Sequence, residues 1–178
     1  RLEPEMRTLI AYKADSRVVP TVRSNGVLIA QIAPRGLVIS GTSSIVQLDA
    51  WDWEHAVLQA DDGVHLNWPA AYQRSGWWAE PGETDSEKKD ERANRLEELR
   101  SFFRKAKAYA QEKAPENVDL RLEAMRGVFT GRKALFVHAN AAKEISEAVQ
   151  FAKAEGVKRL VIVGGYDAWR VADLLREN

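Results

Sequence analysis

The chain has 178 residues, enough for one domain with a substantial hydrophobic core. Its 26 Lys and Arg residues balance 26 Asp and Glu residues, so no basic field attracts nucleic acid or an anionic membrane, and we expect neither partner. Cysteine is absent, which excludes disulfide scaffolds and Cys-ligated metal sites. No run of about 18 apolar residues is present, so we expect no membrane-spanning helix and a soluble protein of the cytoplasm or periplasm.

Residues 17–48 carry short β-branched patches separated by turn residues. The patches are residues 18–19, 27–30, 38–39 and 45–46, and the separators are 25–26, 34–36 and 40–42. This pattern predicts short strands broken by glycines, in the form of one strand followed by a glycine-rich loop.

Residues 49–82 are rich in tryptophan and glycine, which predicts an irregular flap with a short helix within residues 52–59. The tryptophans are Trp51, Trp53, Trp68, Trp77 and Trp78. We favour a buried aromatic cluster that pins the flap over an exposed patch that contacts substrate or another subunit. His55 and His65 have no metal-ligand spacing to each other, and we interpret His55 as a solvent-exposed loop residue.

Residues 84–126 read as two helices. Thr84 and Glu87 fit a capping box at the start of a long helix. Its apolar stripe consists of Leu96, Leu99, Phe103, Ala106 and Ala110. Pro115 ends this helix, and a second one is expected over residues 119–126, ending near Gly127.

Residues 133–178 read as strand, helix, strand, helix. Apolar runs at 134–137 and 160–163 flank a helix whose apolar face Gly156 can terminate with a left-handed cap. Such a unit favours parallel neighbouring strands. The carboxyl ends of parallel strands lie together, where α/β sheets bind ligands. The polar residues that follow the two runs are His138, Asn140, Gly164, Gly165 and Asp167.

His138 is the strongest chemical candidate, because a histidine at the end of a buried strand can ligate a metal or act as a general base. The alternative is a histidine that only hydrogen-bonds neighbouring backbone. Asn140 fits the N-cap of the following helix better than a substrate ligand, and Asp167 fits the cap of the last helix. Gly164 and Gly165 permit close backbone approach, but lack the third glycine of a nucleotide site.

At these residues the chain resembles the metal-dependent amidohydrolase superfamily, in the branch of imidazolonepropionase-like enzymes. Residues 135–140 look like the fifth barrel strand of that branch, whose histidine is a metal ligand, and residues 161–168 look like the sixth. Residues 19–22 and 40–46 are similar to the second strand and its glycine-rich loop, and residues 121–125 to the helix before the fifth strand. The resemblance implies an α/β fold, an incomplete (β/α)8 barrel, with residues 1–178 as one partial catalytic domain.

The chain also departs from the family pattern. It contains no His-x-His, it has Gly164 where the sixth-strand histidine is expected, and it does not reach the eighth-strand aspartate. Only His138 remains of the metal ligands. We therefore expect an internal piece of the barrel that binds no metal and is inactive alone.

For the complete enzyme, the resemblance implies a divalent metal, zinc above all, and a small-molecule substrate whose non-peptide amide or cyclic-amide C–N bond is hydrolysed by metal-activated water. The substrate-binding candidates are Asn140, Gly164, Gly165 and Asp167. Two alternatives stay open: a barrel kept as a non-catalytic scaffold or binding module, and an open doubly wound domain that binds a nucleotide. A cut barrel leaves strand edges unpaired, so we expect a homo-oligomer.

Overall fold

The computed structural model describes residues 1–71 and 85–177 and shows one mixed five-stranded sheet in the order β1-β2-β3-β4-β5. The strands are β1 (Ile29–Ile32), β2 (Ile39–Gln47), β3 (Val57–Asn67), β4 (Ala134–Ala139) and β5 (Leu160–Gly164). β1, β2 and β3 pair antiparallel, whereas β3, β4 and β5 pair parallel. The prediction of a parallel sheet is therefore wrong for the first half. Residues 33–38 and 48–56 make connections that are too short for a parallel crossover.

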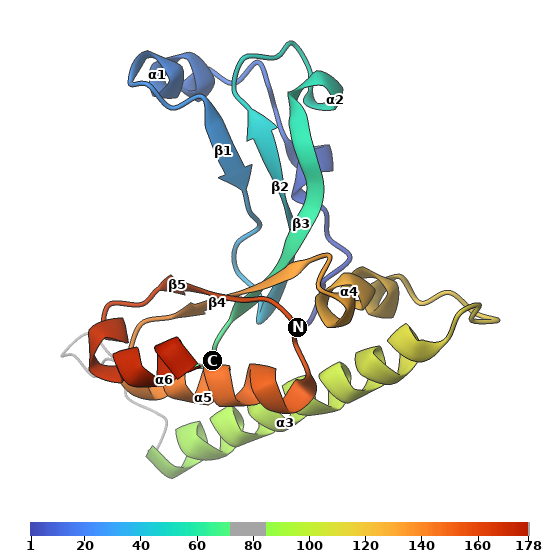
Figure 1. Ribbon diagram of the computed structural model, residues 1–178, viewed down its shortest axis with the longest axis vertical. Coiled ribbons are helices and arrows are strands. Elements are labelled where there is room, and N and C mark those ends of the chain that lie inside the picture. Colours follow the sequence, from blue (N-terminus) through green and yellow to red (C-terminus); the bar gives the residue numbers. More distant parts are fainter. Residues whose placement is uncertain (72–84, 178) are drawn as a thin grey trace.

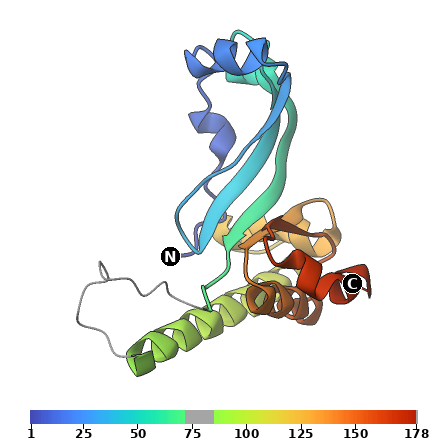
Figure 2. The same cartoon turned by 90° about the vertical axis from the view of Figure 1, so that its left-hand side faces the viewer.

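Figure 1 shows two parts of the molecule that share β2 and β3. The arm consists of β1, most of β2 and the first half of β3, with η1 (Thr8–Ala11), α1 (Val18–Ser24) and α2 (Trp53–Ala56) beside it. The base consists of the start of β2, the second half of β3, β4, β5 and the remaining helices. These are α3 (Asp85–Gln111), α4 (Leu120–Thr130), α5 (Ala142–Glu155), η2 (Ala168–Val171) and α6 (Ala172–Glu177). Figure 2 shows that the sheet curls as it passes from arm to base.

The main core lies between the base helices and one face of β3 and β4. Side chains alternate between the two faces of a strand, so every second residue reaches this core. The strands contribute Val64, Leu66, Leu135 and Val137, and the helices contribute Leu99, Phe103, Met125 and Ile145, all fully buried. A smaller core around Leu9, Val46, Leu48 and Ala56 holds the arm.

In the part of the chain that the structure describes, no helix is long and apolar enough to cross a bilayer.

The first predicted strand, at residues 18–19, is wrong, and so is the likeness of residues 19–22 to a barrel strand. These residues form α1, in which Val19 and Val22 pack together against the small core of the arm. Their spacing of three residues suits a helix. Pro20 lies in the first turn, where a missing backbone N–H costs no helical hydrogen bond.

The predicted break at residues 40–42 is also wrong, because these residues continue β2. Gly41 is needed there for close backbone approach: a Cβ atom would lie 2.3 Å from the carbonyl oxygen of Met6. The N-terminal segment runs parallel to the strand here, with bridges at Leu2–Ile39 and Arg7–Thr42, and Thr42 donates its backbone N–H to the same oxygen at 2.7 Å. This glycine marks the close approach of two segments and not a turn.

The predicted flap at residues 49–82 contains the longest strand, β3, preceded by the short helix α2. Trp68 is buried, as the cluster interpretation requires, but Trp51 is 95% exposed and Trp53 is 39% exposed. The buried-cluster prediction is therefore wrong for Trp51 and Trp53. Trp77, Trp78 and the capping residue Thr84 lie outside the described residues.

The helices of the base agree better with the sequence. Leu99, Phe103 and Ala106 of the predicted stripe are fully buried in α3. α5 ends at Gly156 in the left-handed conformation, as predicted. The second helix, however, does not end at Gly127. α4 continues to Thr130 and ends at Gly131, which is in the left-handed conformation. Gly127 is buried within the helix, and the side chain of Lys133 lies where a Cβ atom of residue 127 would be.

Candidate functional site

The second face of β3 and β4 carries a different set of side chains from the core face. His65 on β3 lies opposite Phe136 on β4, and Asn67 lies opposite His138. Because the intervening residues Val64, Leu66, Leu135 and Val137 face the helices, these four face away from them. The parallel pairing of β3 with β4 thus brings together two histidines that are far apart in the sequence.

His65 and His138 form a direct hydrogen bond. Nδ1 of His65 lies 2.9 Å from Nε2 of His138. The ring centroids lie 5.2 Å apart. This is about the nitrogen–nitrogen distance plus the radius of each ring, so the two nitrogens lie on the line between the ring centres and point at each other. Two imidazoles that shared one metal ion would instead point at a third position between them. The contact is an imidazole–imidazole hydrogen bond.

His65 is packed on both sides and has little freedom to turn. It is 2% exposed, and its ring stacks on Phe136 with the centroids 4.8 Å apart and the planes 10° from parallel. Gly63 makes room for the Phe136 ring, since a Cβ atom there would lie 2.2 Å from a ring carbon. A missing side chain on β3 therefore supports the stack that holds His65.

Both histidines are more acidic than an ordinary histidine. Burial, together with a smaller contribution from the neighbouring His138, lowers the pKa of His65 to about 4, against an opposing effect of Asp62. Burial also lowers the pKa of His138, with a smaller contribution from the positive charge of Arg35. Both rings are therefore neutral at pH 7, and each has one protonated nitrogen and one lone pair.

The second nitrogen of His65 is enclosed without a partner. No residue among those described offers a hydrogen bond to its Nε2, which is buried. A buried polar atom without a partner costs about 1–3 kcal/mol of folding free energy, so an apolar ring would be the more stable choice at this place. This cost argues that the histidine serves a purpose other than stability.

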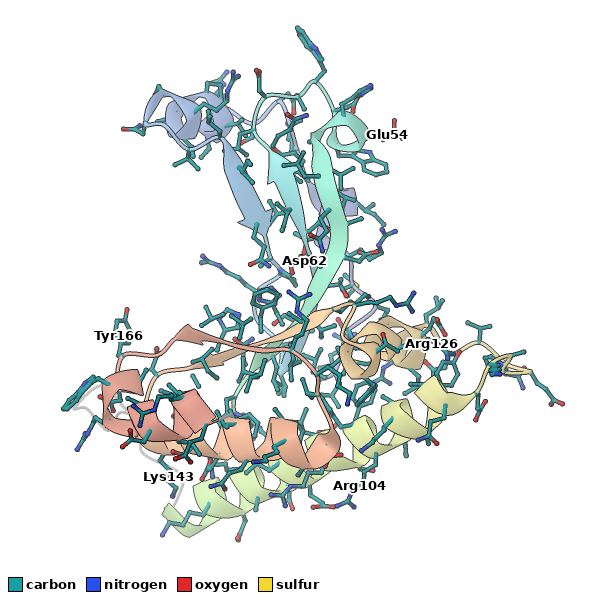
Figure 3. All side chains as sticks on the ribbon, viewed as in Figure 1. Glu54, Asp62, Arg104, Arg126, Lys143 and Tyr166 are labelled. Carbon is teal, nitrogen blue, oxygen red and sulfur yellow. The ribbon has the colours of Figure 1, made fainter. Side chains whose placement is uncertain are left out.

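A polar cluster in the arm lies next to the histidine pair. Asp62 is 7% exposed and accepts hydrogen bonds from Oγ of Ser43 at 2.8 Å and Nε2 of Gln31 at 2.6 Å. Figure 3 places Asp62 on β3 where the arm meets the base. This cluster joins β1, β2 and β3, and both carboxylate oxygens of Asp62 are occupied by neutral donors.

The carboxyl ends of β4 and β5 lie side by side, as predicted. His138 is opposite Val163 and Ala139 is opposite Gly164 in a parallel pair. The loops that follow are joined by two backbone hydrogen bonds, from Gly165 to Ala139 and from Asp167 to Asn140, each of 2.9 Å. The predicted residues His138, Asn140, Gly164, Gly165 and Asp167 are thus gathered at one sheet edge.

Two of these residues do not have the predicted capping roles. The N-cap of α5 is Ala141 and not Asn140. Oε2 of Glu144 reaches back to the backbone N–H groups of Asn140 and Ala141, at 3.3 and 3.2 Å. Asp167 stands at the N-cap position of η2, but its side chain makes no capping hydrogen bond there. Its carboxylate accepts from the backbone N–H of Ala142 at 3.3 Å and so binds the first turn of α5 instead.

Gly164 stands in a place where a side chain does not fit. Its φ is +92°, and a Cβ atom would lie 2.3 Å from Oδ1 of Asn140. The backbone conformation of Gly164 and the neighbouring Asn140 amide therefore leave no space for a metal-ligating side chain at this position. A histidine could not occupy it without movement of both.

Sequence reasoning missed His65 and Asp62. The alternation of Val64, Leu66 and Trp68 with His65 and Asn67 is a clear strand signal of period two, but the surrounding tryptophans obscured it. Once this segment is placed as a strand beside residues 134–139, His65 and His138 fall on the same face. His55 is exposed, as predicted, but lies in α2 and not in a loop, and its Nδ1 lies 2.8 Å from a carboxylate oxygen of Asp52, the N-cap of that helix in the arm.

The donor atoms at the edge do not make a complete metal site. In residues 1–71 and 85–177 no three His, Cys, Asp or Glu side chains are grouped so that they could hold a metal ion. His65 occupies Nε2 of His138, and Gly164 has no side chain. One imidazole nitrogen remains, against the three protein ligands of a typical catalytic zinc site.

Comparison with known proteins gives one informative match. No family model matches the chain, and no curated protein matches it. A crystal structure of an amidohydrolase from Thermotoga maritima is similar in fold, with a TM-score of 0.79 and 20% sequence identity. The match covers 98% of this chain and 46% of that protein, so the chain spans less than half the length of its structural neighbour. The curled mixed α/β sheet with its helices is thus similar in fold to part of that amidohydrolase.

Proposed function

We propose that the chain forms part of a (β/α)8 barrel whose complete form hydrolyses non-peptide C–N bonds of small amides or cyclic amides, in the manner of imidazolonepropionase-like enzymes. The observation that carries the proposal is the structural match over 98% of the chain, together with a histidine at the carboxyl end of β4. Active sites of barrels lie at this end of the strands.

His138 is the proposed metal ligand, and zinc is the preferred ion for an imidazole site. In the family that the sequence resembles, the metal supplies an activated water. Asn140, Gly164, Gly165 and Asp167 border the same edge and are the proposed contacts for the substrate. Because one imidazole nitrogen falls short of a ligand set, the chain by itself is inactive and holds no metal tightly.

The test compares this chain with a longer natural protein that contains it. Zinc content after dialysis and hydrolysis of a panel of N-acyl and cyclic amides are measured for both. We expect about one zinc ion and hydrolysis only in the longer protein, and loss of both on changing His138→Ala. Tight binding of zinc by the chain alone, or hydrolysis that survives this change, would overturn the proposal.

A second candidate is a barrel that has lost catalysis and serves as a scaffold or binding module. The specific observation in its favour is Gly164, whose positive φ and contact with Asn140 leave no room for a ligand. The same experiment separates the two functions. A longer protein that binds no zinc and hydrolyses none of the panel would favour the scaffold.

A further inference from the structure

We propose that a cleft between the arm and α4 binds a small molecule with one carboxylate group, which lies against the ammonium group of Lys133. This α4 cleft has a volume of about 640 Å³. Its walls come from the N-terminal segment, β2, β3, α4 and the turn before β4, and its lining includes Arg7, Asp61, Leu120, Ala124 and Lys133. Figure 1 shows α4 beside the foot of the arm.

The α4 cleft is separate from the histidine pair. Lys133 directly precedes β4, whereas His138 is the fifth residue of that strand. A strand advances about 3.3 Å per residue, so the two Cα atoms are roughly 16 Å apart along the strand. Binding in the α4 cleft is therefore independent of the hydrolysis proposed for the carboxyl edge.

The side chain of Lys133 is held in place by α4. Its stem passes over Gly127, where a Cβ atom would lie 2.6 Å from Cγ and 2.9 Å from Cδ of the lysine. Nζ donates a hydrogen bond to the backbone carbonyl oxygen of Ala124 at 3.0 Å. A glycine inside a helix is less favourable than an alanine, so α4 gives up stability to admit the stem. The ammonium group is thus fixed at the cleft by packing.

No carboxylate among the described residues forms an ion pair with the ammonium group of Lys133. Its hydrogen bond to Ala124 uses one of three N–H groups. Burial lowers the pKa of Lys133, and the attraction of Asp61 opposes this effect. Asp61 is itself engaged, because Nε and Nη2 of Arg7 lie 2.9 Å from its two carboxylate oxygens. Two N–H groups of Lys133 therefore remain for an acceptor that a ligand can supply.

The charged residues that line the α4 cleft leave an excess of one positive charge. Four of them form two ion pairs, Arg7 with Asp61 and Arg126 with Glu123. The other three are Lys133, Arg132 and Glu5. One carboxylate balances this excess, whereas a phosphate group, with nearly two negative charges above pH 7, exceeds it. The cleft therefore favours a monocarboxylate over a phosphate.

The lining also offers apolar surface to a ligand. Leu120 and Ala124 lie four residues apart on α4 and so share a face of the helix. Leu120 is 68% exposed, so contact with an apolar group would remove its side chain from water. Ligand sites commonly combine apolar walls with a few polar groups that fix the orientation. We therefore expect a ligand with a carboxylate at one end and an apolar body.

The site is tested by NMR titration of this chain with benzoate, acetate, benzyl alcohol and inorganic phosphate. We expect benzoate to bind saturably and to shift the Cε and Nζ signals of Lys133. Acetate should bind more weakly because it lacks the ring, phosphate at pH 8 should also bind more weakly, and benzyl alcohol should not bind. Equal binding of benzyl alcohol, tighter binding of phosphate, or no movement of the Lys133 signals with benzoate would overturn the proposal.

The role of the ammonium group is tested with Lys133→Met. Methionine keeps an unbranched stem over Gly127 but removes the charge, so benzoate should bind at least about tenfold more weakly, as for the loss of a charge-assisted hydrogen bond. Lys105→Met, at an exposed residue of α3, is the matched control and should leave the affinity unchanged. Natural affinity in Lys133→Met, or an equal loss in Lys105→Met, would contradict a site at Lys133.

Arg132→Gln gives a second test that does not disturb the core. Arg132 is exposed at the cleft and is the other cation outside the two ion pairs, so its loss should weaken benzoate binding about threefold. This variant decides the question if Lys133→Met does not fold, which urea unfolding of each variant shows. Unchanged binding of benzoate by Arg132→Gln would count against the charge excess as the source of affinity.

Discussion

At the scale of single residues, the buried imidazole of His65 is less favourable for the stability of the fold than an apolar ring would be. The ring lies 2% exposed with one nitrogen unpartnered, and its pKa is lowered from 6.5 to about 4 by burial. Because the pKa of His65 is lower in the folded protein than in the unfolded chain, the pH-dependent part of its contribution to stability is fully present above pH 6.5. This contribution is lost as the pH falls toward 4, because the unfolded chain then binds a proton that the folded protein excludes.

We therefore expect His65→Phe to change the free energy of unfolding by no more than about 1 kcal/mol at pH 7, where a lost hydrogen bond offsets the removal of an unpartnered atom. Between pH 7 and pH 4.5 the natural protein should lose about 2 kcal/mol more than the variant. Urea unfolding of both proteins at the two pH values measures this difference. Parallel loss of stability in both would show that His65 is not the group responsible.

Gly164 gives the second prediction at this scale. Gly164→His should not create a metal ligand, and should destabilise the fold by about 1–3 kcal/mol because the side chain meets a positive φ and the Asn140 amide. Gly26→Ala is the matched control. Gly26 has a similar φ of +86° but nothing within 4 Å, so its cost reports the backbone strain alone. Zinc content and thermal unfolding of both variants check the prediction; zinc held tightly by Gly164→His would refute it.

Single residues show the limit of sequence reasoning most clearly. His138 was found because it follows a continuous apolar run, which is a local signal. His65 was missed because its role depends on pairing with a strand that lies far along the chain. Asn140 and Asp167 were given ordinary capping roles, but the cap of α5 is made by a glutamate three residues into the helix and by an aspartate from the next loop.

At the scale of elements, the chain is predictable where one pattern dominates a segment. α5 has an apolar stripe and a glycine stop, and β4 and β5 are continuous apolar runs, so all three were placed correctly. The arm was not, because its glycines and prolines have other uses there. Gly41 allows the N-terminal segment to approach β2 closely, and Pro20 lies in the first turn of a helix. Turn residues in the sequence do not distinguish these uses from a true turn.

The start of α5 shows how one buried side chain can fix several segments. Glu144 accepts hydrogen bonds from the backbone of Asn140, Ala141 and Ala71, the last at 2.9 Å. We expect Glu144→Ala to cost about 1–3 kcal/mol, because these backbone N–H groups lose their acceptor in a buried place. Glu97→Ala, on the exposed face of α3, is the control and should cost less than about 0.5 kcal/mol. Urea unfolding of the two variants measures the difference; equal costs would show that the contacts of Glu144 contribute little.

At the scale of the whole molecule, β1 and β5 each have a single neighbour in the sheet within the described residues. An unpaired edge can join another strand, so we expect a dimer or larger assembly in solution. Val161, 39% exposed on β5, lies at one of these edges. Val161→Lys should shift the protein toward the monomer in light scattering, whereas Trp51→Ser, at the tip of the arm, should not. A monomeric natural protein, or dissociation only with Trp51→Ser, would contradict assembly through the edge of β5.

β3 runs through both halves of the molecule. It passes from the tip of the arm to the histidine pair without interruption; β2 pairs antiparallel with it from Val57 to Leu66, and β4 joins its other side in parallel from Gly63 onward. A change in the tilt of the hairpin, whether from a bound partner or from a shortened loop, therefore also turns the β3 backbone that carries His65.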